Sequence, residues 1–155
     1  MRTIKFKGKC ISPKYKGKTA CGSLLTFPDG TARIFEHDHD KVFNYYSVDP
    51  DTVCQFTGFL DKSGREIYEG DILRSDKYPF SCMEDDARDN YFGIIEWSDE
   101  EAMFLLTCVK NSKSAVRGIS DGISDEITQQ KLEDCELVGS VHDKEWQEKL
   151  NLKDE

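Results

Sequence analysis

The sequence predicts a mainly β protein with a few short helices, that is, a β-rich α+β fold. Two stretches alternate as half-buried strands do: apolar and cationic side chains alternate over residues 3–7, and β-branched and aromatic side chains recur over residues 53–59. Turn sequences such as Pro28-Asp29-Gly30 separate the strand-like segments. Nine Phe, six Tyr and two Trp supply aromatic area, so the chain is expected to fold although 33% of its residues are charged.

The N-terminal third is expected to contain three strands. Residues 3–7 form the first, and Pro13 and Gly17 interrupt the chain after it. Residues 21–27 form the second. The turn at residues 28–31 places Pro where φ is preset and Gly where φ can be positive, so residues 31–35 should return antiparallel as a hairpin.

The aromatic residues Phe43, Tyr45 and Tyr46 predict another short strand or a sheet edge. The sequence Asp49-Pro50-Asp51 follows it. This sequence predicts a turn or a single helical turn, because Asp49 can cap the N-terminus and Pro50 suits the first helical position.

The central stretch, residues 54–73, is expected to consist of two tight turns that connect three pieces of strand. Asp61-Lys62-Ser63-Gly64 has the residue preferences of a type I turn, with a small acid first and Gly last. Gly70-Asp71 predicts a second turn, in which the Asp71 carboxylate can accept hydrogen bonds from nearby backbone N–H groups.

The second half is expected to be built on a β-hairpin. Residues 91–97 have strong β propensity, residues 102–109 form an apolar run suited to a central strand, and the acidic sequence 98–101 turns one into the other. Residues 135–139 predict a closing strand. Two further segments are expected to be loops, namely residues 75–90 and 111–122.

Two short helices are expected near the C-terminus. The sequence SDEITQQKL, starting at Ser124, has a good N-cap and early acids. Residues 143–150 form the second predicted helix, in which Trp146 and Leu150 are spaced to face the same way.

The 155 residues are expected to form one compact unit. The alternative is a division into an N-terminal β subdomain over 1–60 and a C-terminal subdomain over 61–155. Strand–turn–strand segments that end in a Gly-Asp turn are typical of small barrels, so an SH3-like barrel is the fold expected for that second part.

The net charge of −9 is distributed unevenly. Residues 1–20 carry a charge of +7 and contain no acid, whereas the remaining 135 residues carry −16. Such an acidic body argues against a nucleic-acid partner, and the basic N-terminal segment keeps a phosphate contact open as an alternative. No apolar run approaches the roughly 20 residues of a membrane span, and no secretory signal is apparent, so a cytoplasmic protein is expected.

The six cysteines are far apart and never form C-x-x-C, which favours reduced thiols over disulfides or zinc ligands. The most metal-like sequence is Glu36-His37-Asp38-His39-Asp40. On a strand, His37 and His39 would face the same side and could share a cation. The same residues also suit a polar loop after a hairpin, and this interpretation is favoured, so no cofactor is expected.

The run QFTGFLDKSGREIYEGDIL, residues 55–73, resembles the signature of the YopX family. Three shorter similarities lie at residues 1–9, 48–53 and 135–142, so the resemblance reaches the start, middle and end of the chain. YopX proteins belong to phages, prophages and other mobile elements. The resemblance therefore implies provenance and a β-rich fold, and it implies no particular reaction.

The signature residues are expected to fix backbone geometry rather than to perform chemistry. Gly supplies positive φ, the acids accept backbone hydrogen bonds, and Ile67 needs burial. This structural signature comprises Thr57, Gly58, Asp61, Gly64, Glu66, Ile67, Tyr68, Glu69, Gly70 and Asp71. The alternative is an enzyme centred on Glu66, Glu69 and Asp71, which would need a pocket where these carboxylates or His142 converge.

The sequence offers no nucleophile with a base and no phosphate-binding loop, so no catalytic residue is assigned. The favoured hypothesis is an accessory protein of a phage or mobile element that binds another protein without catalysing a reaction. The alternatives are a nucleic-acid-associated factor that uses the basic N-terminal segment, and the enzyme described above. The partner is unknown, no membrane is expected, and self-association stays open.

Overall fold

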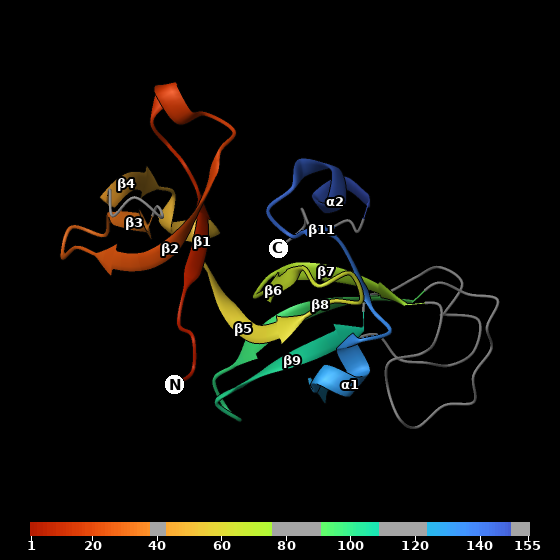
Figure 1. The fold of residues 1–155 in the computed structure, drawn as a ribbon. Coiled ribbons are helices and arrows are strands. Elements are labelled where there is room, and N and C mark those ends of the chain that lie inside the picture. Colours follow the sequence, from red (N-terminus) through yellow and green to blue (C-terminus); the bar gives the residue numbers. More distant parts are fainter. Residues whose placement is uncertain (38–42, 76–90, 109–123, 150–155) are drawn as a thin grey trace. The chain divides into compact units, whose positions relative to one another are not determined.

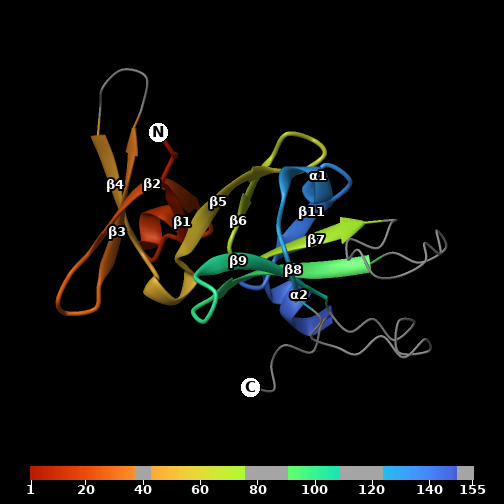
Figure 2. The same cartoon turned by 90° about the horizontal axis from the view of Figure 1, so that it is seen from below.

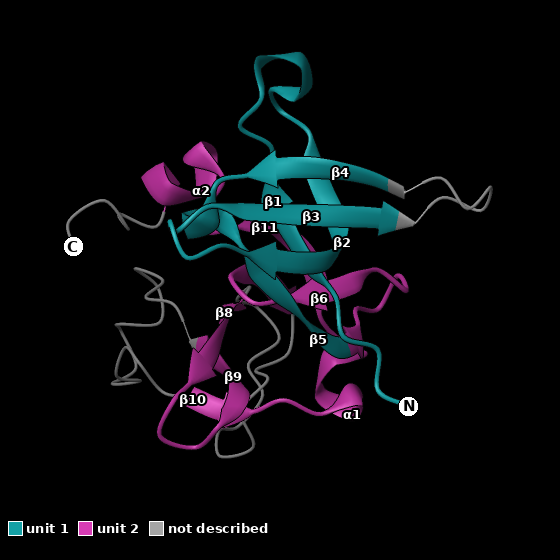
Figure 3. Cartoon of the chain, turned by 90° about the vertical axis from the view of Figure 1, so that its left-hand side faces the viewer, with its two compact units in different colours: residues 1–58 teal, residues 59–155 magenta. Residues whose placement is uncertain are grey.

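The computed structural model describes residues 1–37, 43–75, 91–108 and 124–149 (Figure 1). This part of the chain is mostly β, with antiparallel strand pairing and two short α-helices, as the sequence predicts. It forms two compact units, residues 1–58 and 59–155 (Figure 3). The predicted subdomains 1–60 and 61–155 stay a prediction, as does the SH3-like barrel in the second of them.

Unit 1 consists of short antiparallel strands and two 3₁₀ turns. Its elements are β1 (Phe6–Lys9), η1 (Pro13–Tyr15), β2 (Thr19–Thr26), β3 (Ala32–His37), β4 (Phe43–Val48), η2 (Pro50–Thr52) and β5 (Cys54–Leu60), the last of which runs past the unit boundary. The strand order is β4-β3-β2-β1-β5. The first strand begins at Phe6, three residues later than the sequence predicts, and the hairpin predicted around the turn at residues 28–31 is confirmed.

A bend in β2 gives unit 1 its shape. The first half of β2 pairs with β1, and the second half, from Ser23 onward, pairs with β3. Gly22 lies at this change of partner, and a Cβ atom there would lie 2.0 Å from the carbonyl oxygen of Phe35. Only glycine therefore allows β2 and β3 to approach this closely.

Contacts between the ends of β1 and β4 close unit 1 on itself. Cys10 forms an isolated bridge with Val48. Beside that bridge, the Ile11 N–H donates to the Ser47 carbonyl oxygen at 3.1 Å, and the Asp49 N–H donates to the Lys9 carbonyl oxygen at 2.9 Å. The small core inside consists of Cys10, Ala20, Ala32, Ile34 and Val48.

The single helical turn predicted at residues 49–51 is confirmed as η2. The Asp49 side chain accepts a hydrogen bond from the Asp51 N–H at 3.1 Å, and Pro50 occupies the first position. The cap thus satisfies a backbone donor that the short turn leaves open.

Unit 2 is built on a five-stranded antiparallel sheet of order β10-β9-β8-β7-β11. Its elements are β6 (Glu66–Tyr68), β7 (Asp71–Ser75), β8 (Tyr91–Ser98), β9 (Met103–Cys108), β10 (Ser124–Glu126), α1 (Gln129–Leu132), β11 (Glu136–Ser140) and α2 (Lys144–Lys149). The central pair, β8 and β9, lies side by side in both views (Figures 1 and 2) and confirms the predicted hairpin.

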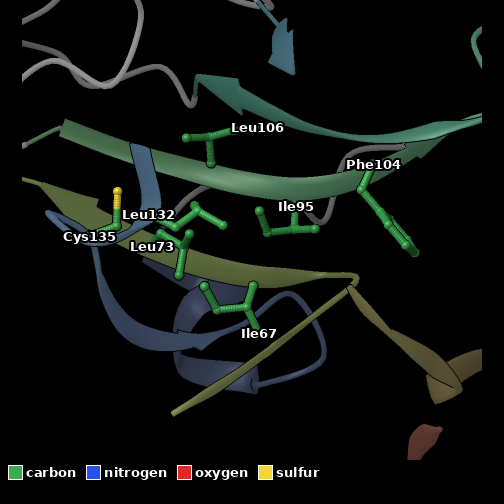
Figure 4. Packing of buried hydrophobic residues seen from close by; sticks show 7 residues of the cluster. All are labelled: Ile67, Leu73, Ile95, Phe104, Leu106, Leu132 and Cys135. Atoms are coloured by element: carbon green, nitrogen blue, oxygen red, sulfur yellow. The ribbon is translucent and has the colours of Figure 1, made fainter. Parts of the chain in front are cut away.

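The core of unit 2 uses larger side chains than that of unit 1. It includes Leu132 of α1 (Figure 4). Ile95 and Ile67 are fully buried, and Leu106 lies 2% exposed. The cluster comprises Ile67, Leu73, Ile95, Phe104, Leu106, Leu132 and Cys135. The hairpin β8–β9 contributes three of these seven residues, so it is central to the core of this unit, as the sequence predicts.

The helix predicted to start at Ser124 is wrong in its first turn. Residues 124–126 form β10, which pairs with β9, and the helix α1 is only four residues long. Thr128, rather than Ser124, is the N-cap and accepts a hydrogen bond from the Lys131 N–H at 3.3 Å. The open edge of β9 offers Ser124–Glu126 a row of hydrogen bonds that a short isolated helix cannot match.

The C-terminal helix α2 packs closely against β11. The Trp146 indole N–H donates to the Val138 carbonyl oxygen at 3.0 Å. A Cβ atom on Gly139 would lie 2.0 Å from the same indole nitrogen, at the point where the register of β11 against β7 shifts. Gly139 therefore makes room for the ring.

Candidate functional site

Asp61 is the most connected residue of the signature. Its side chain is fully buried, with 0% exposure. One carboxylate oxygen accepts hydrogen bonds from the N–H groups of Ser63 and Arg65, and the other accepts from the Leu137 N–H at 2.9 Å. The Arg65 guanidinium contacts that second oxygen at 2.7 Å. A single carboxylate therefore forms the turn and attaches it to β11, 76 residues further along the chain.

The pKa of Asp61 reflects these contacts. Burial is the largest single influence and raises the pKa of the carboxyl group. Together, the hydrogen bonds from Leu137, Arg65 and Ser63 outweigh the effect of burial and hold the pKa of Asp61 below its ordinary value. Asp61 is therefore ionised near neutral pH, and its contacts hold the turn and attach it to β11.

The second turn of the signature uses Asp71 in a similar way. The Asp71 side chain is 1% exposed and accepts a hydrogen bond from the Tyr68 N–H at 2.8 Å. Gly70 donates to the Ile95 carbonyl oxygen and accepts from the Val141 N–H. These bonds fix β7 between β8 and β11, as expected of a turn that directs strands.

The remaining signature residues are distributed along the same segment. Thr57 is buried in β5, Gly58 and Gly64 have φ of 95° and 78°, and Ile67 is fully buried. The Tyr68 hydroxyl donates to Glu66 at 2.8 Å, and Glu69 is half-buried. His142 is half-buried in the turn after β11, where its N–H donates to the Ser140 hydroxyl at 3.3 Å.

The metal hypothesis receives no support from the described residues. His37 is the last residue of β3, and His39 lies outside the described residues. In residues 1–37, 43–75, 91–108 and 124–149, no group of three or more His, Cys, Asp and Glu side chains could hold a metal ion.

The basic N-terminal segment does not present its charges as one exposed patch. Lys5, Lys7 and Lys9 are half-buried. Lys18 forms an ion pair with Glu36 at 3.0 Å, and its ammonium group lies 3.7 Å from the centre of the Tyr46 ring. A hydrogen bond with Tyr46, followed by the Glu36 contact, raises the pKa of Lys18. The three remaining cations, Arg2, Lys14 and Lys16, are exposed.

A surface that sequence analysis missed lies on the sheet of unit 1. Residues directly opposite one another on paired strands point to the same face, which places Leu25 with Arg33 and Phe35 with Tyr45. The core residue Ile34 points to the other face. We call this surface the aromatic face; it comprises Leu25, Phe27, Arg33, Phe35 and Tyr45.

The aromatic face is apolar, cationic at its centre and open to solvent. The Arg33 guanidinium lies 5.0 Å from the centre of the Phe27 ring and 5.2 Å from that of Tyr45. Tyr45 also packs against Phe35, with ring centres 5.7 Å apart. Leu25 is 46% exposed and Tyr45 is 58% exposed. Alternation along β2 and β3 could have revealed this surface, because both faces of these strands carry large side chains.

Comparison with known proteins gives the family. A family model described as YopX protein matches residues 19–145, which is most of the chain. The chain belongs to the YopX family. The resemblance seen in residues 55–73 is thereby confirmed.

A solved structure is also similar to this YopX chain, namely the crystal structure of protein EF1440 from Enterococcus faecalis. The two share 16% sequence identity, with a TM-score of 0.47, over 92% of this chain and 95% of that one. The curated proteins contain no match to this chain. Among the described helices, none is both long and apolar enough to span a membrane.

Proposed function

We propose that this YopX chain is a non-enzymatic accessory protein of a phage or mobile element, and that it acts in the cytoplasm by binding another protein through its aromatic face. The observation that carries the proposal is the exposure of Leu25 and Tyr45 beside Arg33 on one sheet face. Exposed apolar surface with a central Arg and aromatic rings has the composition of protein-binding hot spots.

The positions of the signature acids also favour a binding protein over an enzyme. Asp61 and Asp71 are buried and bound to backbone N–H groups of their own turns. A buried carboxylate that accepts hydrogen bonds from the backbone is poorly placed to take a proton from a substrate, and Asp71 is one of the three acids that the enzyme alternative requires. The enzyme alternative, centred on Glu66, Glu69 and Asp71, is therefore less well supported than a binding surface.

The nucleic-acid alternative is also less well supported. The Lys18 ammonium group is committed to Glu36 and Tyr46, and the lysines of β1 are half-buried. Phosphate binding depends on exposed cations that can release counterions. Arg2, Lys14 and Lys16 alone offer a small basis for it.

The test uses the full chain as bait in extract of the host cell, followed by binding measurements with the purified partner. We expect the double variant Leu25→Asn, Tyr45→Asn to weaken that binding at least about tenfold, the scale of losing a hot-spot contact. The control is Ile4→Asn, since Ile4 is 64% exposed and lies outside the aromatic face.

Two outcomes would contradict the proposal. One is a partner bound equally well by the double variant and the wild type, while circular dichroism shows both folded. The other is retention that disappears on nuclease treatment or falls steeply with salt, which would favour the nucleic-acid alternative.

A further inference from the structure

The outer strand β4 has one side that the described residues do not cover. β4 lies at the end of the strand order of unit 1, where its inner side pairs with β3 along its whole length, from Phe43 to Val48. On its outer side, the β1 end covers only the C-terminal part, through the bridge of Cys10 with Val48 and the bond from the Ile11 N–H to Ser47. Residues 43–46 have no further strand beside them in the described part of the chain.

The covered part shows which backbone groups face outward. The Ser47 carbonyl oxygen points away from β3, because it accepts from Ile11. N–H and C=O groups alternate in direction along a strand, so those of Tyr45 and Phe43 also point away from β3. Within the part of the chain that the structure describes, these two residues therefore present donors and acceptors that no neighbouring strand pairs.

This edge differs from the two outer strands of the sheet of unit 2. β10 contains Asp125 and Glu126, and β11 begins with Glu136. Proteins commonly place charges on outer strands, where they oppose pairing with another chain. β4, with the sequence FNYYSV, has no charged residue.

We propose that β4 pairs antiparallel with β4 of a second copy of this chain. Antiparallel pairing of two copies of β4 brings the strand's central side chain opposite its own counterpart and its neighbours close by, so a charge near the centre of β4 would lie beside a like charge, and an uncharged strand has no such penalty. β4 can therefore pair with a second β4 without bringing like charges together, whereas β10 and β11 carry acids. This inference goes beyond the proposed function and does not depend on it.

The direction of the backbone groups and the short length of the open edge favour one register. Of the registers that this direction allows, the one that uses all the open groups of both residues joins Phe43 of one copy to Tyr45 of the other, and the reverse. Asn44 then lies opposite Asn44 of the second copy, on the two-fold axis. That axis is perpendicular to the sheet, so the aromatic faces of the two copies lie on the same side and form one larger surface.

The test uses charge at the two-fold axis. Asn44 is exposed, so N44D and N44K should each fold as the wild type does. Sedimentation of the wild type should show a monomer–dimer equilibrium between about 1 µM and about 1 mM, the range of a small interface. Each variant should dissociate at least about fivefold more readily, because like charges lie opposite one another.

Sedimentation of a mixture of the two variants is the decisive measurement. N44D and N44K in equal amounts should associate at least as well as the wild type, since opposite charges then meet across the axis. The matched control is T26D with T26K, since Thr26 is exposed on β2 and away from the open edge. These variants should dimerise as the wild type does, alone or mixed.

Amide hydrogen exchange checks the register independently. The amides of Phe43 and Tyr45 should exchange more slowly at high protein concentration, and those of the control position should not change. A wild type that stays monomeric to about 1 mM overturns the inference. So does a dimer that N44D and N44K leave unchanged, since its interface would then lie elsewhere.

Discussion

The two units of the chain contain similar strands and use them differently. Unit 1 has nine Lys and Arg against six Asp and Glu, a formal charge of +3, whereas unit 2 has twelve against 24, a charge of −12. Unit 1 closes around small residues such as Ala20 and Ala32 and leaves aromatic side chains outside. Unit 2 has a core of larger side chains, and its outer strands β10 and β11 contain acids.

This difference suggests that the two units of this YopX chain have different roles, binding in unit 1 and structural support in unit 2. A unit with a small core exposes the surface that can bind, since its large apolar side chains cannot all fit inside. A unit with a larger core and a buried carboxylate such as Asp61 holds distant segments together. Substitutions in each unit test this contrast.

The largest effect is expected from Asp61→Ala, which removes the acceptor of three backbone N–H groups and of Arg65. We expect a loss of about 3 kcal/mol in the free energy of unfolding of unit 2, because buried donors are left without partners. Both tryptophans, Trp97 and Trp146, belong to unit 2, so denaturation followed by their fluorescence measures it directly.

The stability of the wild type should depend on pH through the same Asp61 carboxylate. The pKa of Asp61 is lowered in the folded protein, so its stabilisation is fully present at neutral pH and is lost as pH falls through the folded pKa, below its ordinary value of 3.8. Asp61→Ala should flatten this part of the stability curve. An unchanged acid limb in the variant would contradict the role assigned to Asp61.

A smaller effect, of about 1–3 kcal/mol, is expected from Gly22→Ala in unit 1. The new methyl group would collide with the Phe35 carbonyl oxygen, and the bend of β2 would have to open. Amide exchange of β2 and β3 should accelerate, while the fluorescence transition of unit 2 stays in place. A shift of that transition by a similar amount would show that the two units unfold together. Gly17→Ala is a control, since a Cβ atom there meets nothing within 4 Å, although its positive φ adds some strain.

The smallest effect concerns thiol chemistry and leaves stability unchanged. Cys21 of unit 1 is exposed, whereas burial raises the pKa of Cys135 in unit 2 to about 11. Iodoacetamide at pH 8 should therefore label Cys21 of the native protein quickly and Cys135 only after unfolding, because the thiolate is the reactive form. Peptide mass spectrometry resolves the two sites. Equal labelling rates in the native protein would contradict the burial of Cys135.

The sequence predicted most of the strands correctly because their evidence is local. The backbone is determined within a few neighbouring residues by the alternation of apolar and polar side chains, by Pro50 after Asp49, and by the turn residues 28–31. Local evidence failed at Ser124, where a good helix cap and early acids were outweighed by pairing with β9. Neither the two-residue period nor the cap residues could indicate that residues 124–126 would pair with the edge of β9.

The sequence alone determined the family, the β-rich class and the turns, since these depend on residue types and their spacing. The tertiary structure alone decided that Asp61 binds the Leu137 N–H, that β2 bends at Gly22, and that Leu25, Arg33 and Tyr45 share one face. The reason is physical. A hydrogen bond between residues 76 positions apart, or a surface shared by three strands, depends on strand register and burial, which no local pattern encodes.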